Sequence, residues 1–219
     1  MVHERASLSG GRSCDGPLRS SIDVGTDSDA TEGVSPLLTP AVFLDRDGVL
    51  NRVIARDGKP YPPATLDVLE IPSDVAPALA RLKVAGYRLV VVTNQPDVAR
   101  GTQDRHVVEA INAALKARLP LDEIRVCYHD DRDDCRCRKP RPGLLLQPPA
   151  HDLSRSVMIG DRWRDVEAGR RARVGATVLI VCGYAEVCDV EPDARVASLA
   201  AATDWILSRD ARQAPLQPR

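Results

Sequence analysis

Short apolar runs alternate along this chain with longer segments whose apolar residues recur at helical spacing. The segment after Asp74, for example, places Val75, Leu79 and Leu82 on one stripe and stops at Gly86. The expected strands are 41–44, 87–92, 124–128, 156–159 and 176–182, and the expected helices are 75–85, 104–119, 163–174 and 196–208. Because strands that alternate with helices form parallel sheets, we expect an α/β fold, a parallel sheet with helices on both faces.

Length and composition set the domain boundaries. The chain has 219 residues and is 43% hydrophobic, which suffices for one sizeable core. Residues 1–39 are rich in Ser, Gly, Asp and Thr with little apolar periodicity, so we expect a disordered N-terminal tail there. Residues 40–208 then form a single domain, and residues 209–219 a flexible C-terminal tail.

The overall charge argues against polyanionic partners. The formal net charge is −1 and the pI is about 6.4, whereas nucleic-acid and membrane-surface binding usually require a basic excess. The N-terminus lacks the apolar core of a secretory signal, and no stretch reaches the length of a membrane span. We therefore expect a cytoplasmic, monomeric protein that binds neither nucleic acid nor membrane.

Polar segments follow four of the expected strands. They are DRDG at 45–48, TNQ at 93–95, RKP at 138–140 and GDRWRD at 160–165. Each alone is more typical of a turn or a helix start than of a site. Because ligands of an open parallel sheet bind at the carboxyl ends of its strands, the four together indicate one shared site.

The four segments have the composition that phosphoryl transfer requires, namely a nucleophile, cations and a proton donor. Asp45 can attack phosphorus and form an aspartyl phosphate, and Asp47 can protonate the leaving alkoxide and then activate water. Lys139 and the Thr93 hydroxyl can hold the remaining phosphate oxygens. The candidate Mg²⁺ ligands are Asp45, Asp47 and Asp161, supplemented by a backbone carbonyl, while Asp165 is left open as a further ligand.

Three cysteines and a histidine crowd into the eleven residues before Arg138. They are Cys127, His129, Cys135 and Cys137. Four such ligands in so short a loop can complete a tetrahedral Zn²⁺ site, which would be structural and would pin the loop that carries Arg138 and Lys139. The alternative is a group of reduced cysteines on a surface loop without metal.

The segments DRDGVLN, VVVTNQ, CRKPRPG and MIGDRWRDVEAG, in this order, resemble the four motifs of the haloacid dehalogenase phosphatase superfamily over about residues 41–182. The resemblance implies a Rossmann-like core, obligatory Mg²⁺, Asp45 as nucleophile, Asp47 as acid/base and Asp161 as metal ligand. The segment NRVIARDGKPY, with Asp57 and Gly58 as a turn signal, resembles the flap that follows the nucleophile. The gaps between motifs are too short for a separate cap domain.

The zinc loop that leads into CRKPRPG is similar to that of the D-glycero-D-manno-heptose 1,7-bisphosphate phosphatases and of the related histidinol-phosphate phosphatases. This resemblance implies a small phosphorylated sugar as substrate, with contacts to it at Asp47, at the turn of Thr93, Asn94 and Gln95, at Arg138 with Lys139, and at Arg162. The surplus cations Arg138 and Arg162 suit a second phosphate. The alternative for Arg162 is a side chain that merely faces solvent.

The expected function is therefore Mg²⁺-dependent removal of the 7-phosphate of a heptose 1,7-bisphosphate. Histidinol phosphate and other sugar phosphates stay open as substrates, because Pro96 and the proline-rich stretch after Lys59 depart from the heptose pattern. A catalytically silent relative that binds a phosphorylated ligand is the alternative of a different class. Such a protein would have no need to keep Asp45, Asp47, Lys139 and Asp161 together.

Overall fold

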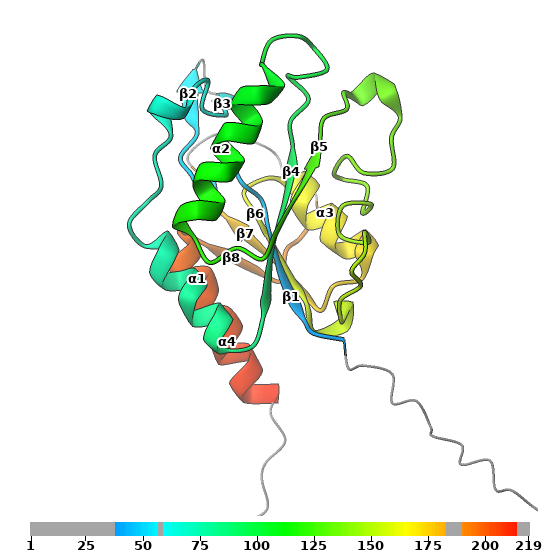
Figure 1. Cartoon of the computed structure of the whole chain (residues 1–219). Coiled ribbons are helices and arrows are strands. Elements are labelled where there is room, and N and C mark those ends of the chain that lie inside the picture. Colours follow the sequence, from blue (N-terminus) through cyan, green and yellow to red (C-terminus); the bar gives the residue numbers. More distant parts are fainter. Residues whose placement is uncertain (1–37, 57–58, 183–189, 214–219) are drawn as a thin grey trace, which may run out of the picture. The chain divides into compact units, whose positions relative to one another are not determined.

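The computed structural model describes residues 38–56, 59–182 and 190–213. Its main sheet has six parallel strands in the order β5-β4-β1-β6-β7-β8. The strands are β1 (Ala41–Leu44), β4 (Arg88–Asn94), β5 (Glu123–Cys127), β6 (Val157–Gly160), β7 (Ala176–Ile180) and β8 (Ala194–Val196). The α/β architecture expected from the alternating pattern is confirmed, and β1 lies at the centre of the sheet (Figure 1).

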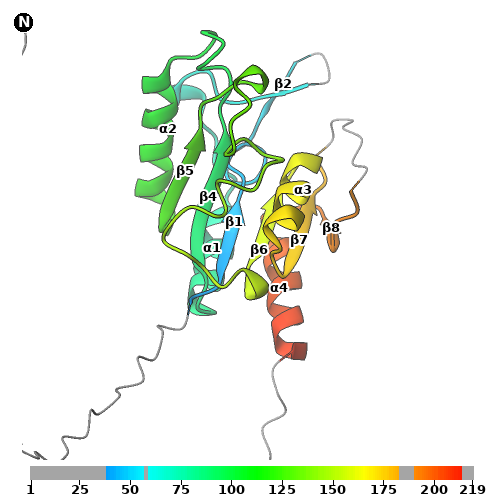
Figure 2. The same cartoon turned by 90° about the vertical axis from the view of Figure 1, so that its right-hand side faces the viewer.

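Helices cover both faces of the sheet, as expected, but unequally (Figures 1 and 2). The helices α1 (Val75–Val84), α2 (Arg105–Arg118) and α4 (Leu199–Gln213) pack their apolar stripes in one core with Val42 and Leu44 of β1. On the other face, α3 (Trp163–Ala172) and the loop residues Leu144 and Leu145 pack against Phe43. Every residue of β1 is buried, as its unbroken apolar run predicts.

The ends of the chain differ from expectation in two places. Strand β8 was not predicted, and Val196, expected in the last helix, instead pairs with Ile180 of β7. Helix α4 runs to Gln213, so residues 209–213 are helical rather than part of a flexible tail. A reason lies in tertiary contacts, since Asp210 accepts a hydrogen bond from the Tyr87 hydroxyl at 2.7 Å and Asp204 pairs with Arg81 of α1.

A small antiparallel hairpin follows the end of β1. It consists of β2 (Ile54–Arg56) and β3 (Lys59–Tyr61), in agreement with the flap expected from the sequence. The turn at Asp57 and Gly58 lies outside the described residues, as do residues 1–37 of the expected N-terminal tail and residues 214–219. In the part of the chain that is described, no helix is long and apolar enough to span a membrane.

The strand register brings the polar segments to one level. Leu44 at the end of β1 pairs with Val91 of β4 and with Ile159 of β6. The main chain continues this alignment for one more step, because the Asp45 amide donates to the Ile159 carbonyl at 2.9 Å. The residues that follow these three strands therefore meet at the same edge of the sheet.

Candidate active site

A cavity of about 300 Å³ lies where the carboxyl ends of the central strands meet. It brings together every site residue predicted from the four polar segments: Asp45, Asp47, Thr93, Asn94, Gln95, Arg138, Lys139, Asp161, Arg162 and Asp165. The hairpin contributes Tyr61 to the wall of this cavity and the loop after β5 contributes Asp131. The expected convergence of the four segments at one edge of the sheet is thus what the structure shows.

Lys139 is the centre of the buried charge. Its ammonium donates to Asp45 Oδ1 at 2.9 Å and to Asp165 Oδ1 at 2.6 Å, and its side chain is 2% exposed. Burial disfavours the charge on Lys139, but the carboxylates of Asp165 and Asp45 outweigh this effect and raise the pKa of Lys139. The lysine is therefore a fixed cation in contact with the predicted nucleophile.

The acidic side of the site carries more negative charge than Lys139 balances. Burial raises the pKa of Asp45 to about 6, with the charges of Asp165 and Asp47 adding to the shift and Lys139 opposing it. Burial and the charges of Asp45 and Asp165 also raise the pKa of Asp161 well above its usual range. A further cation would relieve both effects.

The carboxylates of Asp45, Asp161 and Asp165 fit a divalent cation. One oxygen of each lies within 4.8 Å of the others, and all three residues are buried. Asp161 Oδ1 is buried without a hydrogen-bond partner among the described residues, which is costly for a carboxylate oxygen unless a cation faces it. Clustered carboxylate oxygens are the ligands that Mg²⁺ prefers. Asp165, left open by the sequence, belongs to this cluster.

The Asp47 carboxylate is not part of that cluster. This differs from the prediction that its side chain is a Mg²⁺ ligand. Its two oxygens instead accept hydrogen bonds from three neighbours. Arg46 donates to Asp47 Oδ2 through Nη2 at 2.9 Å, Asn51 donates to Oδ1 at 2.9 Å, and Gln95 donates to Oδ2 at 2.8 Å. Hydrogen-bond donors thus hold this carboxylate in the cavity wall, and it lies outside the cluster of Asp45, Asp161 and Asp165.

Close approach at Gly160 lets Asp165 reach the site. A Cβ atom on Gly160, the last residue of β6, would lie 2.1 Å from the Asp165 Cβ. Asp165 lies in the first turn of α3, where its Oδ2 also accepts a hydrogen bond from the Arg162 amide at 3.1 Å. The glycine therefore allows one carboxylate to close the helix start and face Lys139 at the same time.

The side chains in the turn of Thr93, Asn94 and Gln95 form hydrogen bonds with other residues of the site. Asn94 Nδ2 donates to the Lys139 carbonyl at 3.0 Å, and Asn94 Oδ1 accepts from the Lys139 amide at 3.1 Å. Gln95 Nε2 donates to Thr93 Oγ1 at 2.9 Å in addition to Asp47. Asn94 and Gln95 line the cavity as expected, but their amide groups position Lys139 and Asp47.

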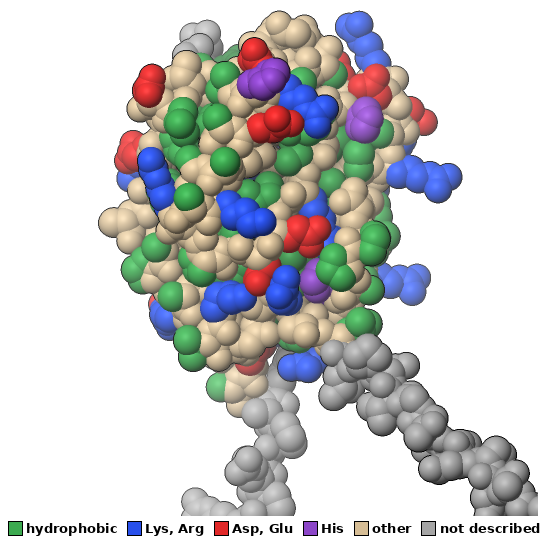
Figure 3. Space-filling view, viewed as in Figure 1, with side chains coloured by type: hydrophobic (Ala, Val, Ile, Leu, Met, Phe, Trp, Pro, Cys, Tyr) green, Lys and Arg blue, Asp and Glu red, His purple; other side chains and the backbone are tan. Residues whose placement is uncertain are grey.

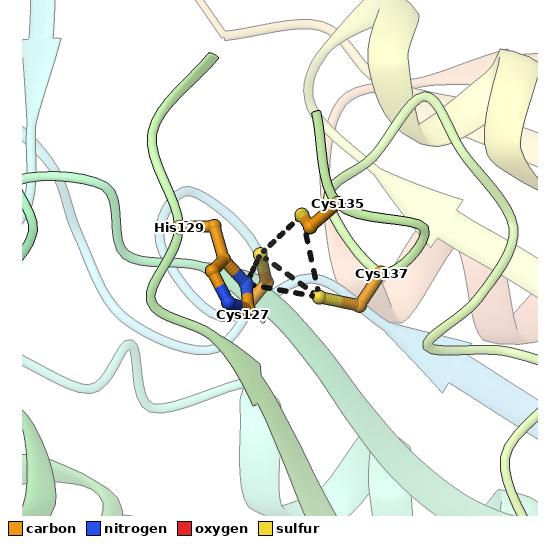
Figure 4. A group of neighbouring side chains, drawn as sticks. All are labelled: Cys127, His129, Cys135 and Cys137. Carbon is orange, nitrogen blue, oxygen red and sulfur yellow. Dashed lines mark hydrogen bonds between the residues drawn. The ribbon is translucent and has the colours of Figure 1, made fainter. Parts of the chain in front are cut away.

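The four predicted zinc ligands converge at the end of β5 (Figure 4). Cys137 Sγ lies 3.3 Å from Cys127 Sγ, 3.5 Å from Cys135 Sγ and 3.3 Å from His129 Nδ1. A tetrahedral Zn²⁺ with sulfur at about 2.3 Å needs sulfurs roughly 3.8 Å apart, close to these separations. The cysteines are not joined by disulfides, and burial raises the pKa of Cys127, so a bound cation would be needed to hold its thiolate.

The cysteine loop is tied to the cavity through ion pairs. Arg138 Nε donates to Asp131 Oδ1 at 2.8 Å, and Arg100 pairs with Asp130 at 2.5 Å and with Asp131 at 3.5 Å. The loop also turns back tightly on itself, since the Gly143 amide donates to the Arg136 carbonyl at 3.1 Å. This network fixes Arg138 at the cavity.

Several site residues were not found from the sequence. Arg46 and Asn112 are buried and bonded to one another, while Arg100 and Arg164 line the cavity. The sequence signal for Arg46 was present, because an arginine directly after an apolar strand requires a buried partner or an exit to solvent. Arg164 lies next to Trp163, with its guanidinium carbon 5.1 Å from the ring centroid; it forms no ion pair with a described residue, but its charge helps to lower the pKa of Asp131. Charges of both signs are interspersed on the face seen in Figure 3.

Comparison with known proteins identifies relatives over most of the chain. A HAD-hydrolase-like family model matches residues 136–202. The D-glycero-beta-D-manno-heptose-1,7-bisphosphate 7-phosphatase of Salmonella typhi is 35% identical over 184 residues, which cover 77% of this chain and 90% of the relative. The enzyme of the same name from Escherichia coli K12 is also 35% identical, with 88% of its length covered.

Solved structures agree with the sequence comparison. The D,D-heptose 1,7-bisphosphate phosphatase from B. bronchiseptica, complexed with magnesium and phosphate, has a TM-score of 0.63 and 29% identity. The match covers 78% of this chain and 99% of that structure. The chain therefore belongs to the haloacid dehalogenase-like hydrolases, in the family of the D-glycero-beta-D-manno-heptose-1,7-bisphosphate 7-phosphatases.

Proposed function

We propose that the protein is a Mg²⁺-dependent phosphomonoesterase that removes the 7-phosphate of a D-glycero-D-manno-heptose 1,7-bisphosphate. The observation that carries the reaction class is the pair of hydrogen bonds from Lys139 to Asp45 and Asp165, beside Asp161 with its unpartnered oxygen. A cation facing a nucleophilic carboxylate, next to a divalent-metal cradle, is what phosphoryl transfer through an aspartyl phosphate requires. The name shared by the relatives supports the substrate.

The first half of the reaction transfers the phosphoryl group to the protein. The Asp45 carboxylate attacks phosphorus, the bond from phosphorus to the sugar oxygen breaks, and Asp47 donates a proton to that oxygen. Lys139 and the Thr93 hydroxyl bind the other phosphate oxygens and neutralise part of their charge. When bound by Asp45, Asp161 and Asp165, Mg²⁺ supplies Lewis-acid neutralisation of the phosphoryl charge.

The second half regenerates the carboxylate. Asp47, now ionised, accepts a proton from water while the water oxygen attacks the phosphorus of the aspartyl phosphate. The bond between phosphorus and the Asp45 oxygen breaks, and phosphate leaves. The three donors around Asp47 hold its carboxyl group in one place, so the same group can give a proton in the first half and accept one in the second.

The walls of the cavity support a phosphorylated sugar as the substrate. The hairpin provides Pro60 and Tyr61, and the turn after β4 provides Pro96, so two proline rings and an aromatic ring line the cavity. Arg138, Arg162 and Arg164 also line the cavity and provide cations. We propose that these arginines bind the phosphate that is not hydrolysed, and that the hairpin and the cysteine loop choose the sugar in place of a cap domain.

We further propose that Cys127, His129, Cys135 and Cys137 bind a structural Zn²⁺. All four ligand positions of the metal would be filled by protein, which leaves no open position for catalysis. Cys137 is adjacent in sequence to Arg138, so the metal would hold the segment that carries Arg138 and Lys139.

The test is phosphate release with Mg²⁺ from a panel of both anomers of heptose 1,7-bisphosphate, histidinol phosphate and simple sugar phosphates. A strong preference for the 7-phosphate of one heptose anomer is expected. Preference for histidinol phosphate or another sugar phosphate would overturn the proposed substrate but leave the proposed phosphatase reaction in place. Binding of phosphorylated sugars without any turnover would instead indicate a silent relative and refute the phosphatase.

A further inference from the structure

A buried arginine lies behind the predicted acid/base. Arg46 is 0% exposed, the largest of the fully buried side chains among the described residues. Its Nη2 and Nε donate to Asp47 Oδ2 at 2.9 and 3.1 Å. Its third contact leads away from the cavity, since Nη1 donates to Asn112 Oδ1 at 2.9 Å. The guanidinium thus joins Asp47 to Asn112, which lies 66 positions after Arg46 in the chain.

Asn112 is a polar exception on the core face of a helix. It lies in α2, whose other buried residues are Val108, Ile111 and Leu115. A buried amide costs free energy unless it is hydrogen-bonded, and an apolar residue at this position would continue the stripe. The amide of Asn112 therefore contributes a hydrogen bond to Arg46 that an apolar residue could not form.

We infer that Asn112 and Arg46 are positioning residues that fix the Asp47 carboxylate for proton transfer to the leaving oxygen. The inference rests on the proposed function, because it presupposes that Asp47 is the acid. Asn112 holds the guanidinium in one orientation, and the guanidinium then presents two donors to Asp47. Asn51 and Gln95 hold the same carboxylate from other directions. A general acid must keep its proton within reach of the leaving oxygen, so loss of this support should weaken acid catalysis.

The alternative is that the pair only stabilises the core. Both roles predict a loss of stability on substitution, so stability cannot distinguish them. Dependence on the leaving group can. An alkyl phosphate releases a poor leaving group that needs a proton, whereas p-nitrophenyl phosphate releases a phenolate that leaves without one. A defect in acid catalysis therefore slows the first far more than the second.

The experiment compares kcat on a sugar 7-phosphate and on p-nitrophenyl phosphate for four variants. Asn112→Leu removes the acceptor at similar volume, and Asn112→Asp keeps an acceptor in the same place. Ile111→Ala is the matched control, because it removes buried volume from the same helix and takes no hydrogen bond away from Arg46. Asp47→Asn gives the pattern expected when the acid itself is lost. Thermal unfolding of each variant checks that it is folded.

The expected result is a loss of about tenfold or more in kcat for Asn112→Leu on the sugar phosphate and of less than about threefold on p-nitrophenyl phosphate. Asn112→Asp should recover most of this loss, and Ile111→Ala should show no selectivity between the two substrates. If Asn112→Leu behaves like Ile111→Ala while Asp47→Asn remains selective, the inference is wrong and the proposed function stands. If Asp47→Asn also slows both substrates equally, Asp47 is not the acid, and both that assignment and the inference are refuted.

Discussion

Asn94 and Lys139 are joined by two hydrogen bonds between the asparagine amide group and the lysine main chain, at 3.0 and 3.1 Å. The end of β4 thereby sets the position of a residue 45 positions later in the chain. Lys139 in turn donates to the carboxylate of Asp45, the proposed nucleophile, at 2.9 Å. The side chain predicted to bind substrate therefore acts on the reaction through the lysine.

Substitution of this asparagine should lower catalysis more than it lowers stability. Asn94→Ala removes two hydrogen bonds, at a cost of roughly 1–3 kcal/mol, and frees the Lys139 main chain to move. We expect kcat/KM for the sugar phosphate to fall on the order of tenfold to a hundredfold, measured by phosphate release. Asn51→Ala, which removes a donor to Asp47 and no hydrogen bond to Lys139, serves for comparison. Full activity in Asn94→Ala would contradict the coupling.

Loss of the nucleophile should abolish turnover and preserve the fold. Asp45→Asn keeps the shape of the side chain and removes one of three clustered carboxylates, where burial and then mutual repulsion raise the pKa of Asp45 and Asp161. We expect kcat to fall at least about a thousandfold, with unchanged or slightly increased resistance to urea. Phosphate release and a urea titration of the same preparation measure the two effects. Appreciable turnover would refute Asp45 as the nucleophile.

The sequence predicted the central part of the fold because it depends on local patterns. The run of Ala41–Leu44 is buried on both faces of the sheet and is therefore apolar throughout, which a sequence displays directly. Strand β8 has three residues, none of them fully buried, so its pairing with β7 had no local signal. The last helix extends to Gln213 through contacts with α1 and Tyr87 that only the tertiary structure brings together.

The same distinction holds for the site. Asp45, Lys139 and Asp161 were predicted because their positions follow from strand ends and from motif resemblance. The contact of Arg46 with Asn112 was not, because the two residues belong to different elements and a single asparagine in an apolar stripe has many ordinary explanations. The placement of the Asp47 carboxylate away from the clustered aspartates likewise depends on donors from two segments, Arg46 and Asn51 after β1 and Gln95 after β4.

Removal of the zinc site should cost stability. Cys135→Ser replaces one of the four proposed zinc ligands, whose ligand atoms lie within 4.8 Å of each other. We expect bound zinc, measured by elemental analysis, to fall from about one per chain to a small fraction, and the free energy of unfolding to decrease by roughly 2–5 kcal/mol. Cys182→Ser is the control, since Cys182 is a free cysteine outside the cluster. An unchanged metal content in Cys135→Ser would mean that the four residues bind no zinc.

A buried histidine should make stability depend on pH. His151 is buried beside Arg125. Its ring packs edge-on against the Phe43 ring, with 5.7 Å between the ring centroids. Burial and the Arg125 charge lower its pKa in the folded protein from the usual 6.5. The unfolded chain therefore takes up the proton first, so this contribution to stability is present above about pH 6.5 and is lost as the pH falls below it.

Urea unfolding at pH 7.5 and 5.5 measures this contribution. Wild-type protein should lose more free energy of unfolding between the two pH values than His151→Gln, which has no titrating ring. Other groups that titrate in this interval are the same in both proteins, so the difference belongs to His151. Equal losses in the two proteins would show that the histidine is not held in its neutral form.

The arginines of the cavity should differ in their importance for a second phosphate. Arg138 is already paired with Asp131, whereas Arg164 forms no ion pair with a described residue and stacks near Trp163. A phosphate that reaches Arg164 therefore gains a new charge-assisted hydrogen bond without breaking an existing ion pair. Arg164→Gln should lower the affinity for the heptose bisphosphate about tenfold, a loss of roughly 1.4 kcal/mol.

Calorimetric titration of the inactive Asp45→Asn protein measures this affinity without turnover. Arg164→Gln is added to that background and compared with Arg171→Gln. Arg171 is on the same helix, but it pairs with Glu167 at 2.6 Å and does not line the cavity. The titration is repeated with the heptose 7-monophosphate, which lacks the second phosphate. A loss confined to the bisphosphate and to Arg164→Gln assigns the second phosphate to this arginine. Equal losses for both ligands would place Arg164 at the hydrolysed phosphate, and no loss would remove it from substrate recognition.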